Sequence, residues 1–181
     1  MEFSPDVDTL LDHHTPNDPV VIEAIVHVYY APIHRLASSF LDDAAEADDA
    51  VQETFIKAAL NLDHYRTGTN FKAWLYTITV NTCRGILRKR NVRKKLHSLL
   101  AMVPYSVFSH QLPEENLIRA ETQDTLRAAL IRLPEKHRFP ILLRFVHGLP
   151  ISEIALILGV REGTVHSRLH YGIQKLRSQM E

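Results

Sequence analysis

The stretch LPISEIALILGVREGTVHSRLHY, residues 149–171, decides much of the fold. Ile151 and Ile154 repeat at helical spacing, and Gly159 stands where a tight turn requires the left-handed backbone conformation. Leu169 then continues an inward apolar face on a second helix. The pattern predicts a helix-turn-helix, for which a plain helical hairpin is the alternative.

The second helix of this motif is expected to run from residue 161 to about 177, after a first helix over 152–158. Its outward side chains mix hydrogen-bond donors, acceptors and positive charge, as reading of the major groove requires. The candidate DNA-reading residues are Arg161, Thr164, His166, Ser167, Arg168, His170 and Tyr171. The sequence does not separate base readers from phosphate anchors among them.

Charge is strongly segregated along the chain, although Lys+Arg and Asp+Glu both number 21 in 181 residues. Residues 64–100 contain nine Lys/Arg and no Asp or Glu, whereas residues 1–63 contain thirteen Asp/Glu and two Lys/Arg. Aromatic residues are interleaved with the basic stretch. This combination favours a polyanion with exposed bases as one partner, and a basic protein as the partner of the acidic stretch.

Helical apolar periodicity recurs along most of the chain, and glycine is scarce. We therefore predict an all-α fold of two small helical domains joined by a flexible linker. The expected divisions are a disordered tail over 1–19, a first domain over 20–97, a linker over 98–113 and a second domain over 114–181.

The linker is more apolar than a solvated connection would be, with Leu99, Val103 and Phe108 among its residues. Two interpretations stay open at this point. The segment docks onto a partner, or it forms a short helix that covers one of the chain's own domains.

Composition excludes several functional classes. The single cysteine, Cys83, is consistent with a reducing cytosol, and the acidic N-terminus does not resemble a signal peptide. No apolar run is long enough to insert in a membrane. The sequence contains no HExxH motif, no phosphate-binding glycine loop and no nucleophile motif. We expect a cytoplasmic protein without metal, cofactor or enzymatic activity.

Three motifs in one order carry a family resemblance. Residues 149–169 resemble the C-terminal domain of bacterial extracytoplasmic-function sigma factors. DDAVQETFIKA, residues 48–58, is similar to their polymerase-binding helix, and FKAWLY, residues 71–76, with Val80-Asn81-Thr82 is similar to their promoter-melting helix. The resemblance covers roughly residues 20–177.

The resemblance implies that core RNA polymerase and promoter DNA are the partners. Asp49, Gln52 and Glu53 match the polymerase-contact positions, for which a solvated acidic face is the alternative. The loop 63–70 matches the pocket for a flipped base of the minus-ten element. The residues expected to bind minus-ten DNA are Lys57, Tyr65, Asn70, Lys72, Asn81, Arg84, Arg88, Lys89 and Arg90. Tyr65 is expected to stack on a base, whereas Trp74 is expected to be buried.

The helix-turn-helix matches the domain that reads the minus-thirty-five element. The family is commonly regulated by anti-sigma factors, so such a partner is also expected. The chain departs from the family pattern at His166, a usually basic position, and at Gly85, often Asp. Tyr171-Gly172 replaces a commonly basic neighbourhood, and Pro140 is expected to tighten or delay the first turn of its helix.

Two other classes of function would explain part of the sequence. A stand-alone duplex-binding regulator would use only the helix-turn-helix and would leave the acidic and melting motifs unexplained. An adaptor would bind polymerase without melting DNA.

Overall fold

Every regular element in the described part of the chain is a helix. The computed structural model describes residues 7–15, 18–100 and 120–180. The helices are α1 (Val7–His13), α2 (Pro19–Phe40), α3 (Ala44–Leu60), the short 3-10 turn η1 (Leu62–His64), α4 (Phe71–Leu100), α5 (Ala120–Arg132), α6 (Glu135–Ile141), the π-helical η2 (Leu142–Val146), α7 (Ile151–Leu158) and α8 (Glu162–Met180). The predicted all-α fold in two helical parts is confirmed. Most of the predicted linker lies outside the described residues.

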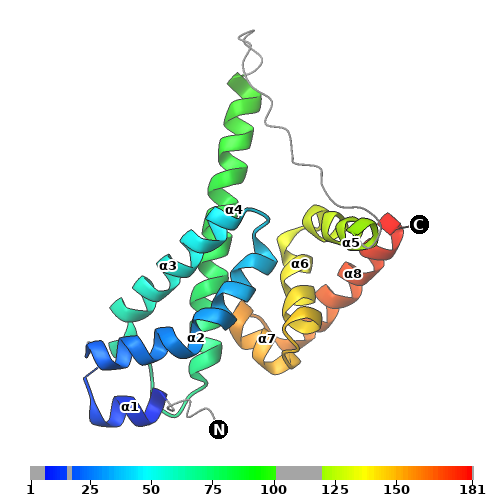
Figure 1. Cartoon of the computed structure of the whole chain (residues 1–181). Helices are drawn as coiled ribbons and strands as arrows, with labels where there is room; N and C mark the ends of the chain where they lie inside the picture. Colours follow the sequence, from blue (N-terminus) through cyan, green and yellow to red (C-terminus); the bar gives the residue numbers. More distant parts are fainter. Residues whose placement is uncertain (1–6, 16–17, 101–119, 181) are drawn as a thin grey trace.

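Short polar side chains fix where the helices of the first part begin. The Asp18 carboxylate accepts from the Val20 backbone N–H at 2.9 Å, ahead of Pro19, and Asp43 accepts from Glu46 at the same distance. Asn70 accepts from the Ala73 N–H at 2.9 Å. Each of these bonds satisfies an orphan donor at a helix start. The helices α2, α3 and α4 then pack around a buried core (Figure 1).

The N-terminal region differs from the expectation of a disordered tail. Val7 begins the helix α1, and its side chain is only 3% exposed. The helix α1 packs against α2, with Leu10 and Leu11 partly buried on the same core. Periodicity missed this helix because seven residues are too few to establish a helical pattern.

The second part contains the predicted helix-turn-helix. Gly159 ends α7 with φ 65° and ψ 38°, the left-handed conformation that the turn requires. The side chains of Val165 and Leu169 face inward, 0% and 8% exposed. The helix α6 begins directly after Pro134. Pro140 does not disturb the first turn of α6, and the π-helical turn η2 follows it directly.

Gly172 allows α8 to approach α6 closely. A Cβ atom at this position would lie 2.7 Å from Ile141 Cδ1 and 3.2 Å from His137 Cβ. The His137 Nδ1 also lies 3.1 Å from the Arg168 carbonyl oxygen. Gly172 is therefore a packing residue. The sequence analysis noted only that Tyr171-Gly172 replaces a commonly basic neighbourhood, and this did not reveal the close packing. Gly85 differs, because a Cβ atom there meets no heavy atom within 4 Å.

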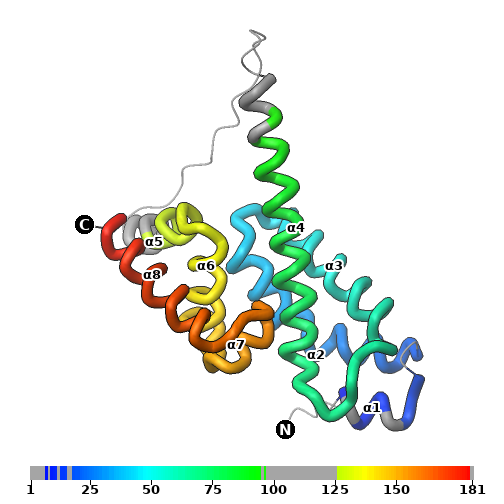
Figure 2. Tube along the Cα trace, turned by 180° about the vertical axis from the view of Figure 1, so that it is seen from behind, coloured from blue at the N-terminus to red at the C-terminus, as the bar shows by residue number. Residues whose placement is uncertain are grey.

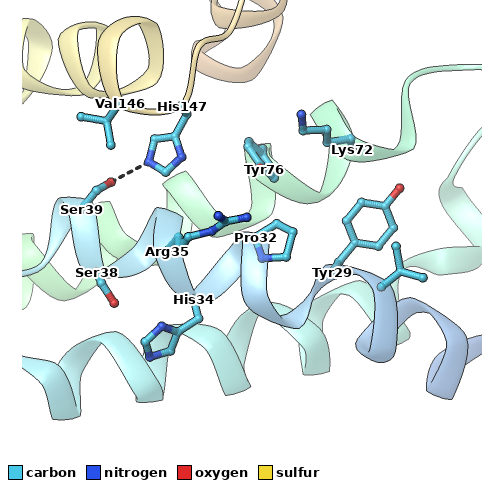
Figure 3. A pocket seen from close by; sticks show the side chains of 11 residues that line it. Tyr29, Pro32, His34, Arg35, Ser38, Ser39, Lys72, Tyr76, Val146 and His147 are labelled. Carbon is cyan, nitrogen blue, oxygen red and sulfur yellow. Dashed lines mark hydrogen bonds between the residues drawn. The ribbon is translucent and has the colours of Figure 1, made fainter. Parts of the chain in front are cut away.

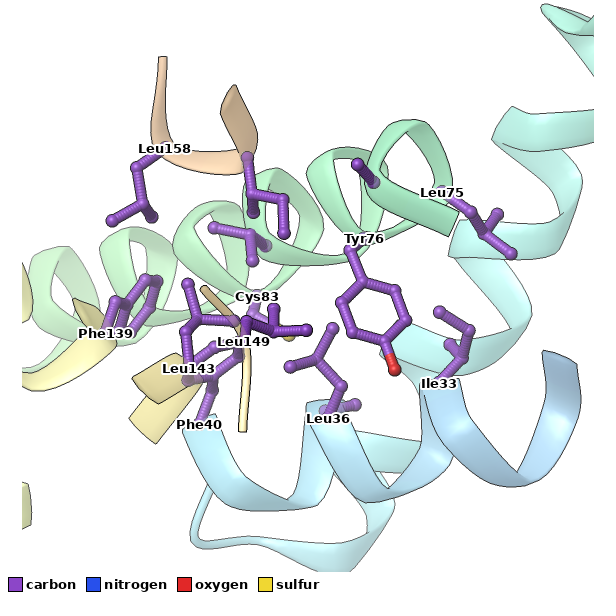
Figure 4. Close-up of a cluster of buried hydrophobic side chains, with 14 of the residues drawn as sticks. Ile33, Leu36, Phe40, Leu75, Tyr76, Cys83, Phe139, Leu143, Leu149 and Leu158 are labelled. Atoms are coloured by element: carbon purple, nitrogen blue, oxygen red, sulfur yellow. The ribbon is translucent and has the colours of Figure 1, made fainter. Parts of the chain in front are cut away.

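The two parts share one hydrophobic core, which the sequence did not predict. The Phe139 ring, 0% exposed, stacks on Phe40 at 4.3 Å between centroids. The helix α7 lies alongside α4 in both views of the chain (Figures 1 and 2). Figure 4 shows Leu143 and Leu149 in the same buried cluster as Cys83 of α4. The described halves are thus closed against each other.

The glycine pair gives a stability prediction. Gly85→Ala should raise the free energy of unfolding by about 0.5–1 kcal/mol, since alanine lowers the backbone entropy cost of a helix and meets no neighbour here. Gly172→Ala should gain less or lose stability, because its Cβ crowds Ile141 and His137. Urea unfolding followed by circular dichroism would measure both. Equal gains would contradict the close packing of α8 on α6.

Burial of Cys83 predicts slow thiol chemistry. The side chain is 0% exposed, and burial raises its pKa to about 12. Raising the pKa from 9.0 favours the protonated thiol, so the thiolate fraction near pH 8 falls about a thousandfold. Alkylation of the native chain by iodoacetamide at pH 8 should be slower than that of the urea-unfolded chain by at least this factor. Comparable rates would show that the shared core is open.

Candidate DNA-binding and polymerase-binding surfaces

The outward face of α8 presents the predicted DNA-reading residues together. The exposed residues are Arg161, which immediately precedes α8, and His166, Ser167, His170 and Tyr171. Thr164 and Arg168 are half-buried. Inside this face, the Ser167 hydroxyl donates to the Thr164 carbonyl at 3.0 Å, and His170 meets Tyr171 edge to face. This face therefore offers hydrogen-bond donors and acceptors together with two strong cations, Arg161 and Arg168.

A hollow of about 430 Å³ lies between the end of α3, the following loop and α4. Its lining residues are Lys57, Asn61, His64, Trp74, Ile78 and Asn81. The Lys57 ammonium is held at its edge, 2.8 Å from a Glu53 carboxylate oxygen and 3.2 Å from the Thr82 hydroxyl. The predicted pair Lys57 and Asn81 thus meets in one hollow. Sequence reasoning missed Asn61, whose polar side chain in a turn gave no periodic signal, whereas His64 lies in the loop 63–70 that was assigned to the pocket.

The positions of Tyr65 and Trp74 are the reverse of those expected from the sequence. Tyr65 is 7% exposed, its hydroxyl donates to the Thr69 carbonyl at 2.7 Å, and its ring packs against Phe71 and Trp74. A ring held in this way has no free face for a base, so the stacking expected of Tyr65 does not fit the structure. Trp74, expected to be buried, is half-buried and lines the hollow. Asn70 acts as the cap of α4.

The basic residues of α4 point in different directions. Arg88 and Lys89 are exposed. Arg84 contacts Asn81 at 3.3 Å and places its guanidinium over the Phe139 ring at 5.4 Å, and burial lowers its pKa. Lys72 lies over the Tyr76 ring on a different side of the helix. The basic residues of α4 that were expected to bind minus-ten DNA are therefore divided between solvent and the second part of the chain.

Arg90 is occupied by carboxylates of the first part. Its guanidinium bonds Asp42, and it lies 3.3 Å from a Glu46 carboxylate oxygen. These contacts join α4 to the corner between α2 and α3, and they raise the pKa of Arg90 against the opposing effect of burial. A side chain engaged in this way is a structural clamp.

The acidic face of α3 extends into an apolar end. Asp49 and Gln52 are exposed, whereas Glu53 is half-buried beside Lys57. One and two turns beyond Gln52, Ile56 and Leu60 are 60% and 73% exposed. Sequence reasoning assigned apolar residues to the core and missed this pair. An exposed row that is acidic at one end and apolar at the other is typical of a protein-binding surface.

Two other classes of site are absent from the described residues. No group of three or more His, Cys, Asp or Glu residues there is placed to hold a metal ion. No helix in the described ranges is both long and apolar enough to cross a membrane.

Comparison with known proteins matches both halves of the chain to one family. The family model for Sigma-70 region 2 matches residues 25–93, and that for Sigma-70 region 4 matches residues 123–176. Over 162 residues, the chain is 33% identical to the ECF RNA polymerase sigma factor SigW of Bacillus subtilis, covering 86% of this chain and 87% of SigW. The chain belongs to the extracytoplasmic-function sigma factors. These proteins are transcription initiation factors and not enzymes.

Further relatives of this sigma factor agree in length and fold. The RNA polymerase sigma-H factor of Pseudomonas aeruginosa is 32% identical over 166 residues, which cover 88% of this chain and 86% of the relative. Among solved structures, the sigma factor RpoE of Bartonella quintana, crystallised with the anti-sigma factor NepR, matches with a TM-score of 0.65 and 27% identity. That match covers 87% of this chain and 95% of the other. CnrH, solved with the cytosolic domain of CnrY, has a similar fold, with a TM-score of 0.67, 23% identity and 97% coverage of each chain.

Proposed function

We propose that three separate surfaces divide the work of this sigma factor: the exposed row of α3 binds core RNA polymerase, the hollow beside α4 captures the minus-ten element, and the outward face of α8 reads the minus-thirty-five element. The observation that carries the proposal is the hollow itself, in which Lys57, Trp74 and Asn81 converge. A stand-alone duplex-binding regulator would have no use for such a hollow.

For polymerase binding, the charged and apolar ends of the α3 row have different tasks. Asp49 and Gln52 supply charge and hydrogen bonding that orient a basic partner, and Ile56 and Leu60 supply apolar area that is lost from water on docking. Glu53 has a second task, because its ion pair holds Lys57 at the hollow.

For promoter opening, the hollow must offset the cost of unstacking a base, a few kcal/mol. The half-buried Trp74 ring offers stacking, worth about 1–3 kcal/mol per base in comparable sites. Asn81 and Asn61 offer amide donors and acceptors, and Lys57 supplies a cation. Arg88 and Lys89 lie exposed farther along α4, where they would hold the phosphate backbone.

Regulation by an anti-sigma factor is part of the proposal. The related structure of RpoE was solved with the anti-sigma factor NepR. A factor that competes for the α3 row or for either DNA-binding surface would keep this chain from polymerase. Such a transcription factor would act in the cytoplasm.

If the exposed row of α3 binds polymerase, substitutions in it should lower transcription and leave folding intact. Asp49→Arg and Ile56→Asp should each lower promoter-specific run-off transcription with purified core polymerase by at least about tenfold, equivalent to about 1.4 kcal/mol of binding free energy. Glu23→Arg is the matched control, because Glu23 is an exposed carboxylate of α2 outside the row. Full activity of both row variants, with the control unchanged, would exclude this surface as the docking site.

The two arginines of α4 predict different responses to salt. Capture of a minus-ten DNA fork by the holoenzyme should weaken steeply with salt, and Arg88→Gln should reduce the log–log slope by about 0.7–0.9 for each lost phosphate contact. Arg90→Gln should lower thermal stability and leave this slope unchanged, since Arg90 already bonds Asp42 and Glu46. A reduced slope for Arg90→Gln would return Arg90 to the DNA surface.

A further inference from the structure

A cleft of about 680 Å³ lies at the junction of the two parts of the chain. The wall from the first part includes Pro32 and Arg35 of α2 and Lys72 of α4, and His147 closes the cleft from the second part. Figure 3 shows these side chains grouped around one hollow. Pockets of this size hold ligands as large as a nucleotide.

The lining of the cleft is cationic and includes no carboxylate. Within the described residues, neither Arg35 nor Lys72 has a carboxylate within ion-pair distance. Burial raises the pKa of Tyr76, which lines the cleft; the charge of Arg35 opposes this rise, and the charge of Glu153 of α7 adds a smaller contribution to it. Two cations without a carboxylate partner therefore line the cleft, Arg35 from α2 and Lys72 from α4.

The pKa of His147 responds both to burial and to the nearby cations. Its Nε2 lies 3.0 Å from the Ser39 hydroxyl oxygen, and that hydroxyl donates to the Leu36 carbonyl at 2.7 Å. The Ser39 oxygen must then accept from His147 Nε2–H. Burial, with the charges of Arg35 and Lys72, lowers the pKa of His147 to about 4. The imidazole is thus neutral near pH 7, and a bound anion would oppose this effect.

The closed junction also contains a costly arginine. Arg138 is 5% exposed, its Nη1 reaches the Ile131 carbonyl only at 3.4 Å, and its Nε has no hydrogen-bond partner among the described residues. Burying a guanidinium without full hydrogen bonding opposes closure. The junction is therefore less stable than an ordinary core, and a ligand that binds only the closed form can shift its population.

We propose that this junction cleft binds a phosphorylated small molecule of nucleotide size, whose phosphates lie between Arg35 and Lys72 and whose organic part rests on the apolar wall of Val28, Pro32 and Val146. Because the two parts of the chain both form the cleft, the ligand stabilises the closed arrangement. When the ligand dissociates, the incomplete hydrogen bonding of the buried Arg138 guanidinium favours opening of the junction.

Closure of the junction would affect transcription initiation, and this consequence rests on the proposed function. Positions −35 and −10 are 25 base pairs apart, about 85 Å along B-DNA at 3.4 Å per pair. The helix α4, with 30 residues, is about 45 Å long. With α7 packed on α4, the helix-turn-helix is held against the first part of the chain, and we infer that the two reading surfaces must separate before both elements can be bound. A ligand in the cleft would therefore act against promoter recognition.

The test uses the full chain, with inorganic pyrophosphate and ATP as probes and potassium chloride at matched ionic strength as the reference. Titration calorimetry measures binding, and alkylation of Cys83 measures opening of the shared core. Both readouts are independent of transcription, so their failure is distinguishable from failure of the proposed function. We expect one saturable site and a severalfold slower alkylation of Cys83 when it is occupied.

Charge-removing variants locate the site. Arg35→Gln and Lys72→Gln should each weaken binding of the probe by at least about tenfold, the effect of losing a charge-assisted contact. Arg35→Lys should retain most of it. Lys136→Gln is the matched control, because Lys136 is exposed on α6 and does not line the cleft. Melting curves confirm that each variant folds. If Arg35→Gln does not fold, Lys72→Gln alone tests the proposal.

The outcomes separate the sources of the anion. Tighter binding of ATP than of pyrophosphate supports a nucleotide, and equal binding supports a site for the phosphates alone. No saturable binding by either probe, or equal weakening in Lys136→Gln, overturns the proposal. It is also overturned if Arg35→Gln weakens binding of single-stranded DNA while the affinity for both probes stays unchanged, because the cations would then serve DNA.

Discussion

The packing of the Phe139 ring between the two parts of the chain is the interaction on which the rest of the structure depends. The ring stacks on Phe40 of α2 and lies under the guanidinium of Arg84 of α4. The helix α4 is thus a shared element, with one side on α2 and α3, another on α7 and the Phe139 ring of α6, and a third in solvent. Its candidate DNA-binding residues are divided accordingly: Asn81 and Arg88 face solvent, while Arg84 packs on Phe139 at the junction.

Charge segregation has two consequences that differ in kind. Part of the basic stretch is neutralised inside the chain, where Arg90 joins α4 to Asp42 and Glu46. The remaining described cations of this stretch have no carboxylate partner within ion-pair distance. Arg84 packs at the junction, whereas the exposed Arg88 and Lys89 are available to DNA phosphates and Lys72 to those of a ligand in the junction cleft. A net charge of zero thus conceals local fields: beside the larger effect of burial, the charges of Arg35 and Lys72 help to lower the pKa of His147 to about 4.

A sigma factor of this design meets opposing demands. Burial of Phe139, Leu143 and Leu149 favours the closed chain, because apolar area is removed from water. Reading two promoter elements favours an open one, because DNA fixes their separation. Closure also leaves Arg138 incompletely bonded. The balance between these terms is the quantity that polymerase, an anti-sigma factor or a ligand in the junction cleft would change.

The sequence by itself determined the helices other than α1, the helix-turn-helix with its turn at Gly159, the grouping of candidate DNA-reading residues on α8, and the family. These features depend on neighbours within a few turns, which periodicity and turn chemistry report. Only the tertiary structure decided that Tyr65 is buried while Trp74 lines the hollow, that Arg90 is a clamp, and that Ile56 and Leu60 remain exposed. Those outcomes depend on which distant helix covers each side chain, and a one-dimensional pattern does not contain that information.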